Sequence, residues 1–142
     1  MVGIGIDVRV RKTRQLHVIQ EVLSQAGRPV SVNEILRAAL TRKDGLGIAT
    51  VYRTVKALIK DGSIVVVDLP GQTPRYELSG KDHHHHFHCD SCRGVFEMDG
   101  CLPDVEGLAG PGFAVRSHEV VLYGTCAACG HRRRKRRRSK RA

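Results

Sequence analysis

Residues 48–78, IATVYRTVKALIKDGSIVVVDLPGQTPRYEL, decide the fold of the first half of this chain. The stretch begins with the pattern of an amphipathic helix, which ends at Gly62. The apolar face of this helix is formed by Val51, Val55, Leu58 and Ile59. Two short strand-like runs follow, SIVVVDL and RYEL, and the segment PGQTP between them carries the proline and glycine of a turn. The stretch therefore predicts a helix followed by a β-hairpin.

Two further helices are expected before this stretch. The first begins near Thr13, where apolar residues start to recur at helical spacing, and ends at Gly27 and Pro29. The second begins at the capping box SVNE, residues 31–34. Its buried side is expected to be formed by Ile35, Leu36 and Leu40. Three helices followed by a hairpin are the outline of a winged-helix domain.

The second half of the chain has a different composition. Seven of the eight histidines and all five cysteines lie after residue 80, and GVFEM and EVVLYG read as strands. We place a hinge at residues 79–81. This division predicts a first domain at 1–79, a second domain at 80–130 and a tail at 131–142.

Two CxxC pairs predict a structural zinc site. Its ligands would be Cys89, Cys92, Cys126 and Cys129, because tetrahedral zinc needs four donors and each pair supplies two thiolates from one turn. The chain has no signal-peptide core and no apolar run of membrane length, so we expect a cytoplasmic protein, in which such pairs bind metal rather than form disulfides. Free buried thiols and a redox pair are the alternatives, and Cys101 is left over.

The run HHHHFH at residues 83–88 offers two sets of ligands. Alternate residues of an extended segment point to opposite sides, so His84 and His86 would face one way and His83 and His85 the other. Each pair could hold a metal if further donors join it. Imidazole with carboxylate suits zinc, iron, manganese or nickel, and the spacing does not choose among them.

Basic residues indicate a nucleic-acid partner in three places. Tyr52, Arg53 and Lys56 lie outside the apolar face of the third helix, where they could contact bases and phosphates, and a solvated helix face is the alternative. The N-terminal basic cluster, which includes Arg11 and Arg14, could grip the DNA backbone or be an ordinary charged terminus. Nine basic residues between positions 132 and 141 account for most of the net charge of +10. We expect them to form a disordered tail that is either solvated or binds phosphates nonspecifically.

The motifs TRQ, VSVNEI, GIATVYRTVKAL, RYEL, HHHHFHCDSC and GFAVRSHEVVLYGTCAAC occur in this order between about residues 11 and 130. Together they resemble the ferric uptake regulator superfamily of bacterial metal-responsive transcription factors. The resemblance implies an α+β protein with an N-terminal winged-helix DNA-binding domain and a small C-terminal α/β dimerisation domain that holds structural zinc. It also implies a homodimer, without enzymatic activity or membrane attachment, that represses metal-homeostasis or stress genes by binding double-stranded operator DNA when metal is bound.

The resemblance assigns ligands to three metal sites and contacts to DNA. The structural Zn²⁺ would be held by the four cysteines of the CxxC pairs. A regulatory site for Fe²⁺, Zn²⁺ or Mn²⁺ would consist of Glu77, His84, His86 and Glu97. An additional site would consist of His83, His85, Asp104 and His118. The expected DNA contacts are Arg11, Arg14, Thr50, Tyr52, Arg53 and Lys56.

The chain departs from the family pattern at three places. Pro29 stands where many relatives supply a further regulatory histidine, and Ser79 stands where a zinc-sensing branch often has a cysteine. The stretch LPDVEGLAGPGF is shorter than the helix that relatives place before the strand corresponding to EVVLYG. The alternatives that stay open are a peroxide-sensing member of the family and a zinc-ribbon RNA-binding protein. A metal-dependent hydrolase would need a nucleophile or general base, and none is recognisable in the sequence.

Overall fold

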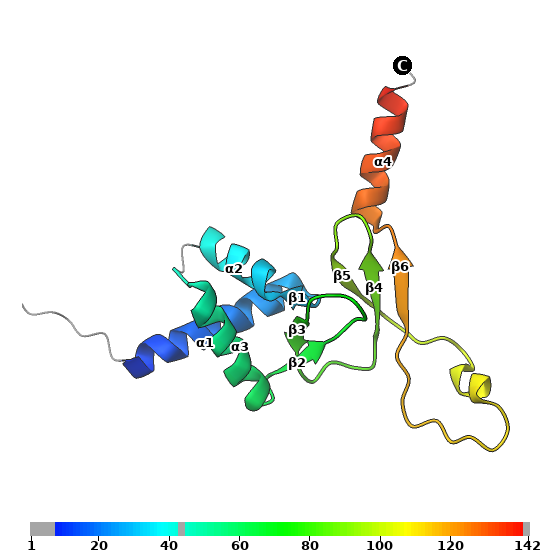
Figure 1. The fold of residues 1–142 in the computed structure, drawn as a ribbon, viewed down its shortest axis with the longest axis horizontal. Helices are drawn as coiled ribbons and strands as arrows, with labels where there is room; N and C mark the ends of the chain where they lie inside the picture. The colour runs from blue at the N-terminus through cyan, green and yellow to red at the C-terminus, as the bar shows by residue number, and fades with distance from the viewer. Residues whose placement is uncertain (1–7, 43–44, 141–142) are drawn as a thin grey trace, which may run out of the picture. The chain divides into compact units, whose positions relative to one another are not determined.

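The computed structural model describes residues 8–42 and 45–140, which form two compact units that divide after Lys81 (Figure 1). This division lies at the C-terminal end of the hinge expected at residues 79–81. Each unit has its own sheet and is described by itself. Within the described ranges, no helix combines the length and the apolar character needed to cross a membrane.

Three helices build the core of the first unit. They are α1 (Val8–Ala26), α2 (Val32–Thr41) and α3 (Ile48–Lys60), and each packs against the other two (Figure 1). Fully buried side chains from all three helices meet there, among them Ile19, Ile35 and Leu58. Leu40, predicted to be buried, is 56% exposed, and Ala39 is buried in its place. The helical phase at the end of α2 therefore differs by one residue from the expected one.

A three-stranded antiparallel sheet completes this unit. The strands are β1 (Val30–Ser31), β2 (Ile64–Val67) and β3 (Arg75–Leu78), in the order β1-β3-β2. The β2–β3 connection turns at Gly71, whose φ of 70° favours glycine. Three helices followed by this hairpin confirm the predicted winged-helix fold.

A buried charge network joins the start of α2 to the hairpin. The Ser31 hydroxyl accepts from the Glu34 amide, and the Glu34 carboxylate accepts from the Ser31 amide, which completes the predicted capping box. Arg28 and the buried Arg75 also donate to this carboxylate. Partial burial raises the pKa of Glu34, but the hydrogen bonds from Ser31 and Arg28 outweigh it and lower the pKa to about 2. Glu34 is therefore ionised at neutral pH, and its single negative charge is shared by two guanidinium groups.

Replacing Glu34 with Gln is expected to destabilise the first unit by roughly 3 kcal/mol, because the buried Arg75 loses its ion pair with Glu34. The folded pKa lies below the usual value of 4.5, so this stabilisation is present above pH 4.5 and is lost as the pH falls toward about 2. Denaturant unfolding between pH 7 and pH 3 measures both effects. Ser31→Ala is the matched control and should cost only about 1 kcal/mol, the usual value of an N-cap. Equal losses in the two variants at every pH would contradict this account of the network.

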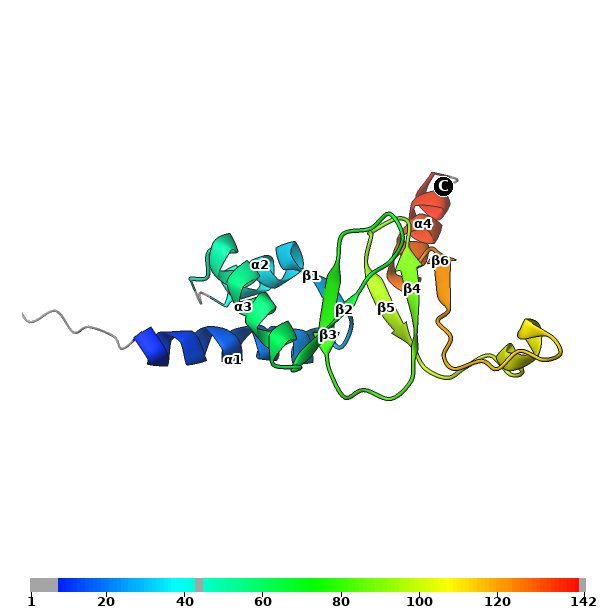
Figure 2. The same cartoon turned by 60° about the horizontal axis from the view of Figure 1, so that its bottom comes forward.

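The second unit is built on a mixed three-stranded sheet. The central strand β4 (His85–Cys89) pairs antiparallel with β5 (Val95–Met98) and parallel with β6 (Val121–Gly124), as Figure 2 shows. The strands predicted from GVFEM and EVVLYG are thus present. Between β5 and β6 the chain forms a long excursion that contains only the short 3-10 helix η1 (Val105–Ala109). This short element lies within LPDVEGLAGPGF, where the comparison with the family pattern led us to expect a shortened helix.

The basic tail differs from the prediction. Residues expected to be disordered form helix α4 (Ala127–Ser139), which begins within the second CxxC pair (Figure 1). Arginine and lysine have good helix propensity, and the turn between Cys126 and Cys129 supplies the first hydrogen-bonded turn, in which the Gly130 amide donates to the Cys126 carbonyl at 2.9 Å. The helix thus starts from a nucleus that the tail alone would lack.

Candidate metal centres and nucleic-acid interface

The four cysteines of the CxxC pairs meet at one end of the second sheet. Cys89 ends β4 and Cys92 lies in the following turn, while Cys126 and Cys129 flank the start of α4. One donor atom from each residue lies within 4.8 Å of the others. Cys92 Sγ and Cys126 Sγ are 3.9 Å apart, close to the edge of about 3.8 Å expected for tetrahedral zinc with bonds of 2.3 Å. The predicted ligand set is thus brought together with a geometry that fits zinc.

The electrostatics of this cluster also favour a cation. Backbone amides of Cys126 and Cys92 donate toward Cys89 and lower its pKa to about 6. The other thiols, Cys126 first among them, raise the pKa of Cys129 to about 12. Four thiolates at this distance repel one another, whereas a divalent cation compensates their charge. The donor set therefore fits a metal better than a group of free thiols.

His84 and His86 lie together on one face of the second sheet, as alternation predicted. Their ring centroids are 5.0 Å apart. His84 Nδ1 lies 2.7 Å from the Asp82 carbonyl, which can only accept, so Nδ1 carries the proton and Nε2 keeps its lone pair. Glu97 stands directly opposite His86 in the β4–β5 register, so the two side chains point to the same face. The second unit thus presents three of the four predicted regulatory ligands on one side.

The fourth predicted ligand, Glu77, belongs to β3 of the first unit. Its side chain is buried, and Lys81 Nζ lies 3.4 Å from its Oε2. Lys81 is thus a cationic partner of this buried carboxylate. The grouping of Glu77 with the histidines stays a prediction.

The opposite face of the run holds a second group of donors. Donor atoms of His83, His85, Cys101 and His118 all lie within 4.8 Å of one another. Asp104, predicted as a ligand here, is not among the described residues that converge at this point. Asp104 caps η1 with a φ of 58°, and its carboxylate lies against Gly107. Sequence reasoning missed Cys101, although its position as the one cysteine outside the CxxC pairs was a signal.

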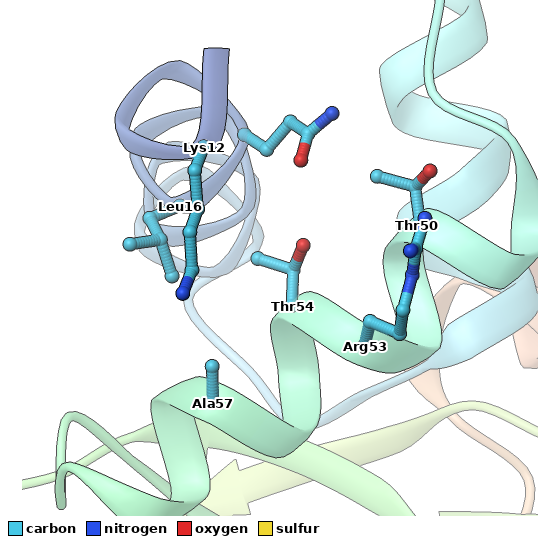
Figure 3. Close-up of a pocket in the computed structure, with 7 residues that line it drawn as sticks. Lys12, Leu16, Thr50, Arg53, Thr54 and Ala57 are labelled. Atoms are coloured by element: carbon cyan, nitrogen blue, oxygen red, sulfur yellow. The ribbon is translucent and has the colours of Figure 1, made fainter. Parts of the chain in front are cut away.

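A hollow lies between α3 and the N-terminal helix α1 (Figure 3). This cavity of about 550 Å³ is lined by Lys12, Gln15, Leu16, Thr50, Arg53, Thr54 and Ala57. Two cationic side chains, Lys12 and Arg53, thus border one space from two helices. Tyr52 and Lys56 are exposed on α3 as predicted, and Tyr52 is 55% accessible. Lys12 and Gln15 were not among the predicted contacts.

The two remaining predicted contacts lie in α1. Arg14 is exposed, whereas the side chain of Arg11 lies outside the described residues. The described basic side chains of α4 are exposed as well, and they cover residues 132–137. The chain thus carries basic surface on both units.

Comparison with known proteins gives one consistent result. A sequence model of the Ferric uptake regulator family matches residues 7–123. The "Ferric uptake regulation protein" of Bordetella parapertussis is 33% identical over 107 residues, which cover 72% of this chain and 76% of that protein. The "Peroxide operon regulator" of Bacillus subtilis is 28% identical, over 87% of this chain and 86% of that protein.

Solved structures agree with the sequence comparisons. The ferric uptake regulator of Helicobacter pylori matches with a TM-score of 0.64 and 25% identity, covering 82% of this chain and 80% of that one. Its structure is described as revealing three functional metal binding sites.

Proposed function

Because the chain belongs to the ferric uptake regulator family, we propose that it is a cytoplasmic, metal-dependent transcriptional repressor that binds operator DNA as a homodimer. The observation that carries this proposal is the combination, in one chain, of a winged helix with an exposed basic α3 and a second unit with clustered metal donors. Neither feature alone selects this function. A basic winged helix can bind DNA without a metal site. A metal site can also occur in a protein that has no helix for DNA contact.

The proposed DNA contact is α3, acting as the recognition helix. Tyr52 and Arg53 are exposed next to each other, so one could reach base edges while the other binds phosphate. The hollow between α1 and α3 suits a phosphate group, since two of the side chains that line it, Lys12 and Arg53, are cationic. Thr50 and Lys56 would add backbone contacts along the same helix.

The proposed regulatory metal binds His84, His86 and Glu97 of the second unit together with Glu77 of the hairpin. The tautomer of His84 supports this role, because the Asp82 carbonyl orients the ring and leaves Nε2 for a metal. A metal held by both units would fix the angle between them. A dimer needs one spacing of its two recognition helices to reach both half-sites, so this angle would control DNA binding.

The proposed dimer uses the second unit. Strand β6 lies at one edge of its sheet, and Leu122 and Tyr123 on it are 47% and 53% exposed. Phe113 and Leu108, in the preceding excursion, are 76% and 85% exposed. Exposed apolar side chains at an open sheet edge favour association with another copy of the chain.

Selection from a randomised DNA duplex library tests the proposed function. The full-length protein, with its structural zinc, should enrich an inverted repeat when Fe²⁺, Zn²⁺ or Mn²⁺ is added, since a symmetric dimer reads two half-sites. No repeat should be enriched when a weak chelator removes only the exchangeable metal. Enrichment that ignores added metal, or a preference for RNA in a parallel selection, would contradict the proposal. The enriched sequence is called the selected duplex below.

Tyr52→Ala is expected to weaken binding of the selected duplex by roughly 1 to 3 kcal/mol, the usual cost of a lost base contact. Binding to a random duplex should change little, and the melting temperature should stay the same because Tyr52 is exposed. Fluorescence anisotropy with both duplexes measures the difference. Lys60→Ala, at the far end of α3, is the matched control. Equal loss on the selected and random duplexes would exclude a base contact for Tyr52.

Removal of residues 132–142 is expected to lower affinity for the selected and the random duplex alike. The basic side chains of α4 would act through phosphates and counterion release, so the dependence of affinity on salt should also become flatter. Replacing Arg132, Arg133 and Arg134 with Gln, which keeps helix propensity, should reproduce part of the effect. A loss confined to the selected duplex would contradict this role of α4.

A further inference from the structure

Cys101 joins the histidines that the regulatory site does not use. Cys101 Sγ lies 2.8 Å from His118 Nε2, and His83 Nε2 lies 3.1 Å from the same nitrogen. We propose that His83, Cys101 and His118, with His85 as a fourth donor, form a mixed imidazole–thiolate site that selects zinc over manganese. This inference concerns the second unit alone and does not rest on the proposed repression of transcription.

The three donors with the shortest separations need little rearrangement to hold an ion. Two imidazole nitrogens bound tetrahedrally to zinc are about 3.3 Å apart, close to the 3.1 Å between His83 and His118. The contact between Cys101 and His118 must widen on binding, and both residues lie outside the strands of the sheet. A cavity of about 250 Å³ borders His83 and His118 and gives an ion access to them.

His85 provides a second observation that points to a ligand at this group of donors. Its side chain is only 5% exposed, and its Nε2 has no hydrogen-bond partner among the described residues. The Val120 amide donates to Nδ1 at 3.2 Å, so in the neutral ring the proton is on Nε2. His85 therefore becomes a ligand only when its ring turns away from the Val120 amide. Binding through Nε2 moves the ring proton to Nδ1, so the bond to the ion replaces the hydrogen bond that the Val120 amide donates to Nδ1.

The carboxylate of Asp104 lies away from the histidines, and this determines which donor atoms the site offers to a metal. Its carboxylate lies against Gly107, where a Cβ would come within 2.7 Å of both carboxylate oxygens. A thiolate thus stands in the ligand set for which the family resemblance implied a carboxylate. Thiolate with imidazole suits zinc and cobalt, whereas manganese and magnesium prefer carboxylate and water. The exchange of one donor therefore shifts selectivity toward the softer ions.

Cobalt titration detects the thiolate directly. Full-length protein with zinc in the four-cysteine site is titrated with Co²⁺, and the sulfur-to-cobalt charge-transfer band is followed in the near ultraviolet. One equivalent should produce the band in the unmodified protein and not in Cys101→Ser, which also corrects for any exchange at the four-cysteine site. Asp104→Asn is the matched control and should keep the band. A band of equal size in Cys101→Ser, or none in the unmodified protein, would overturn the proposal.

Metal affinities give a second test that does not depend on cobalt. Cys101→Ser should weaken zinc binding at this site by at least about tenfold, with an unchanged circular dichroism spectrum because Cys101 is exposed. Cys101→Asp should lower the ratio of zinc to manganese affinity by making the donor set harder. Competition with a fluorescent chelator measures both ions. A larger loss in Asp104→Asn than in Cys101→Ser, or an unchanged zinc-to-manganese ratio in Cys101→Asp, would show that the thiolate is not a ligand.

Discussion

Cys89→Ser is expected to abolish both zinc binding at the four-cysteine site and the cooperative folding of the second unit. This unit has a very small apolar core. Among its described residues, Cys89 and Val95 are the buried apolar ones, whereas the main core cluster lies within the first unit. The free energy of zinc binding, about 10 to 16 kcal/mol in small zinc domains, is then folding free energy. Without this contribution the sheet has too little buried apolar surface to stay folded.

Zinc content by mass spectrometry and thermal unfolding measure this effect. The near-ultraviolet signal of the second unit and the dimer should be lost together, while the helical signal of the first unit should remain because its core contains no cysteine. Cys101→Ser is the matched control and should keep the structural zinc. A Cys89→Ser protein that is free of metal, dimeric and unchanged in melting temperature would contradict a structural role for this site.

His86→Ala is expected to remove the effect of added metal on DNA affinity while leaving the fold intact. To move the protein from 1:99 to 99:1 in favour of the DNA-competent form, the metal must prefer that form by about 5.5 kcal/mol. Loss of one imidazole from a four-ligand site would remove a large part of this preference. The partner strand β5 and the four-cysteine site do not depend on this side chain, so zinc content and dimer should stay unchanged.

His83→Ala is the matched control for this prediction, because His83 belongs to the same histidine run but to the group on its other face. Affinity for the selected duplex is measured for both variants with and without Fe²⁺, Zn²⁺ or Mn²⁺. The metal response should survive in His83→Ala and be absent in His86→Ala. The reverse pattern would assign the switch to the site that contains Cys101.

The winged helix could be predicted because its signals are local. The apolar spacing of α3, the capping box at Ser31 and the turn residues of the hairpin each act over a few residues, and they agree with one another. The four-cysteine site could be predicted for the same reason, since each CxxC turn is a local unit. The buried face at the end of α2 could not be predicted from local signals. Leu40 and Ala39 both suit a helix, and only the packing of the helices decides which of them is buried.

The group around Cys101 could not be predicted from spacing. Cys101 and His118 come together only because the irregular excursion from residue 99 to 120 returns to the histidine run, and its path has no periodic signal. The resemblance assigns Asp104 as a ligand, but its left-handed backbone at the start of η1 turns its carboxylate toward Gly107. Helix α4 was missed for a different reason. Repulsion among like charges favours a disordered tail, whereas the second CxxC pair supplies a nucleus from which the helix continues.

The affinity of the unmodified protein for the selected duplex, with and without exchangeable metal, tests the central claim most directly. The structural zinc is kept in both samples, and salt is held constant because phosphate contacts depend on it. The account predicts that Fe²⁺, Zn²⁺ or Mn²⁺ tightens binding by roughly 5- to 150-fold, the usual range of coupling between two sites. An affinity that is the same in the presence and absence of all three metals would contradict it.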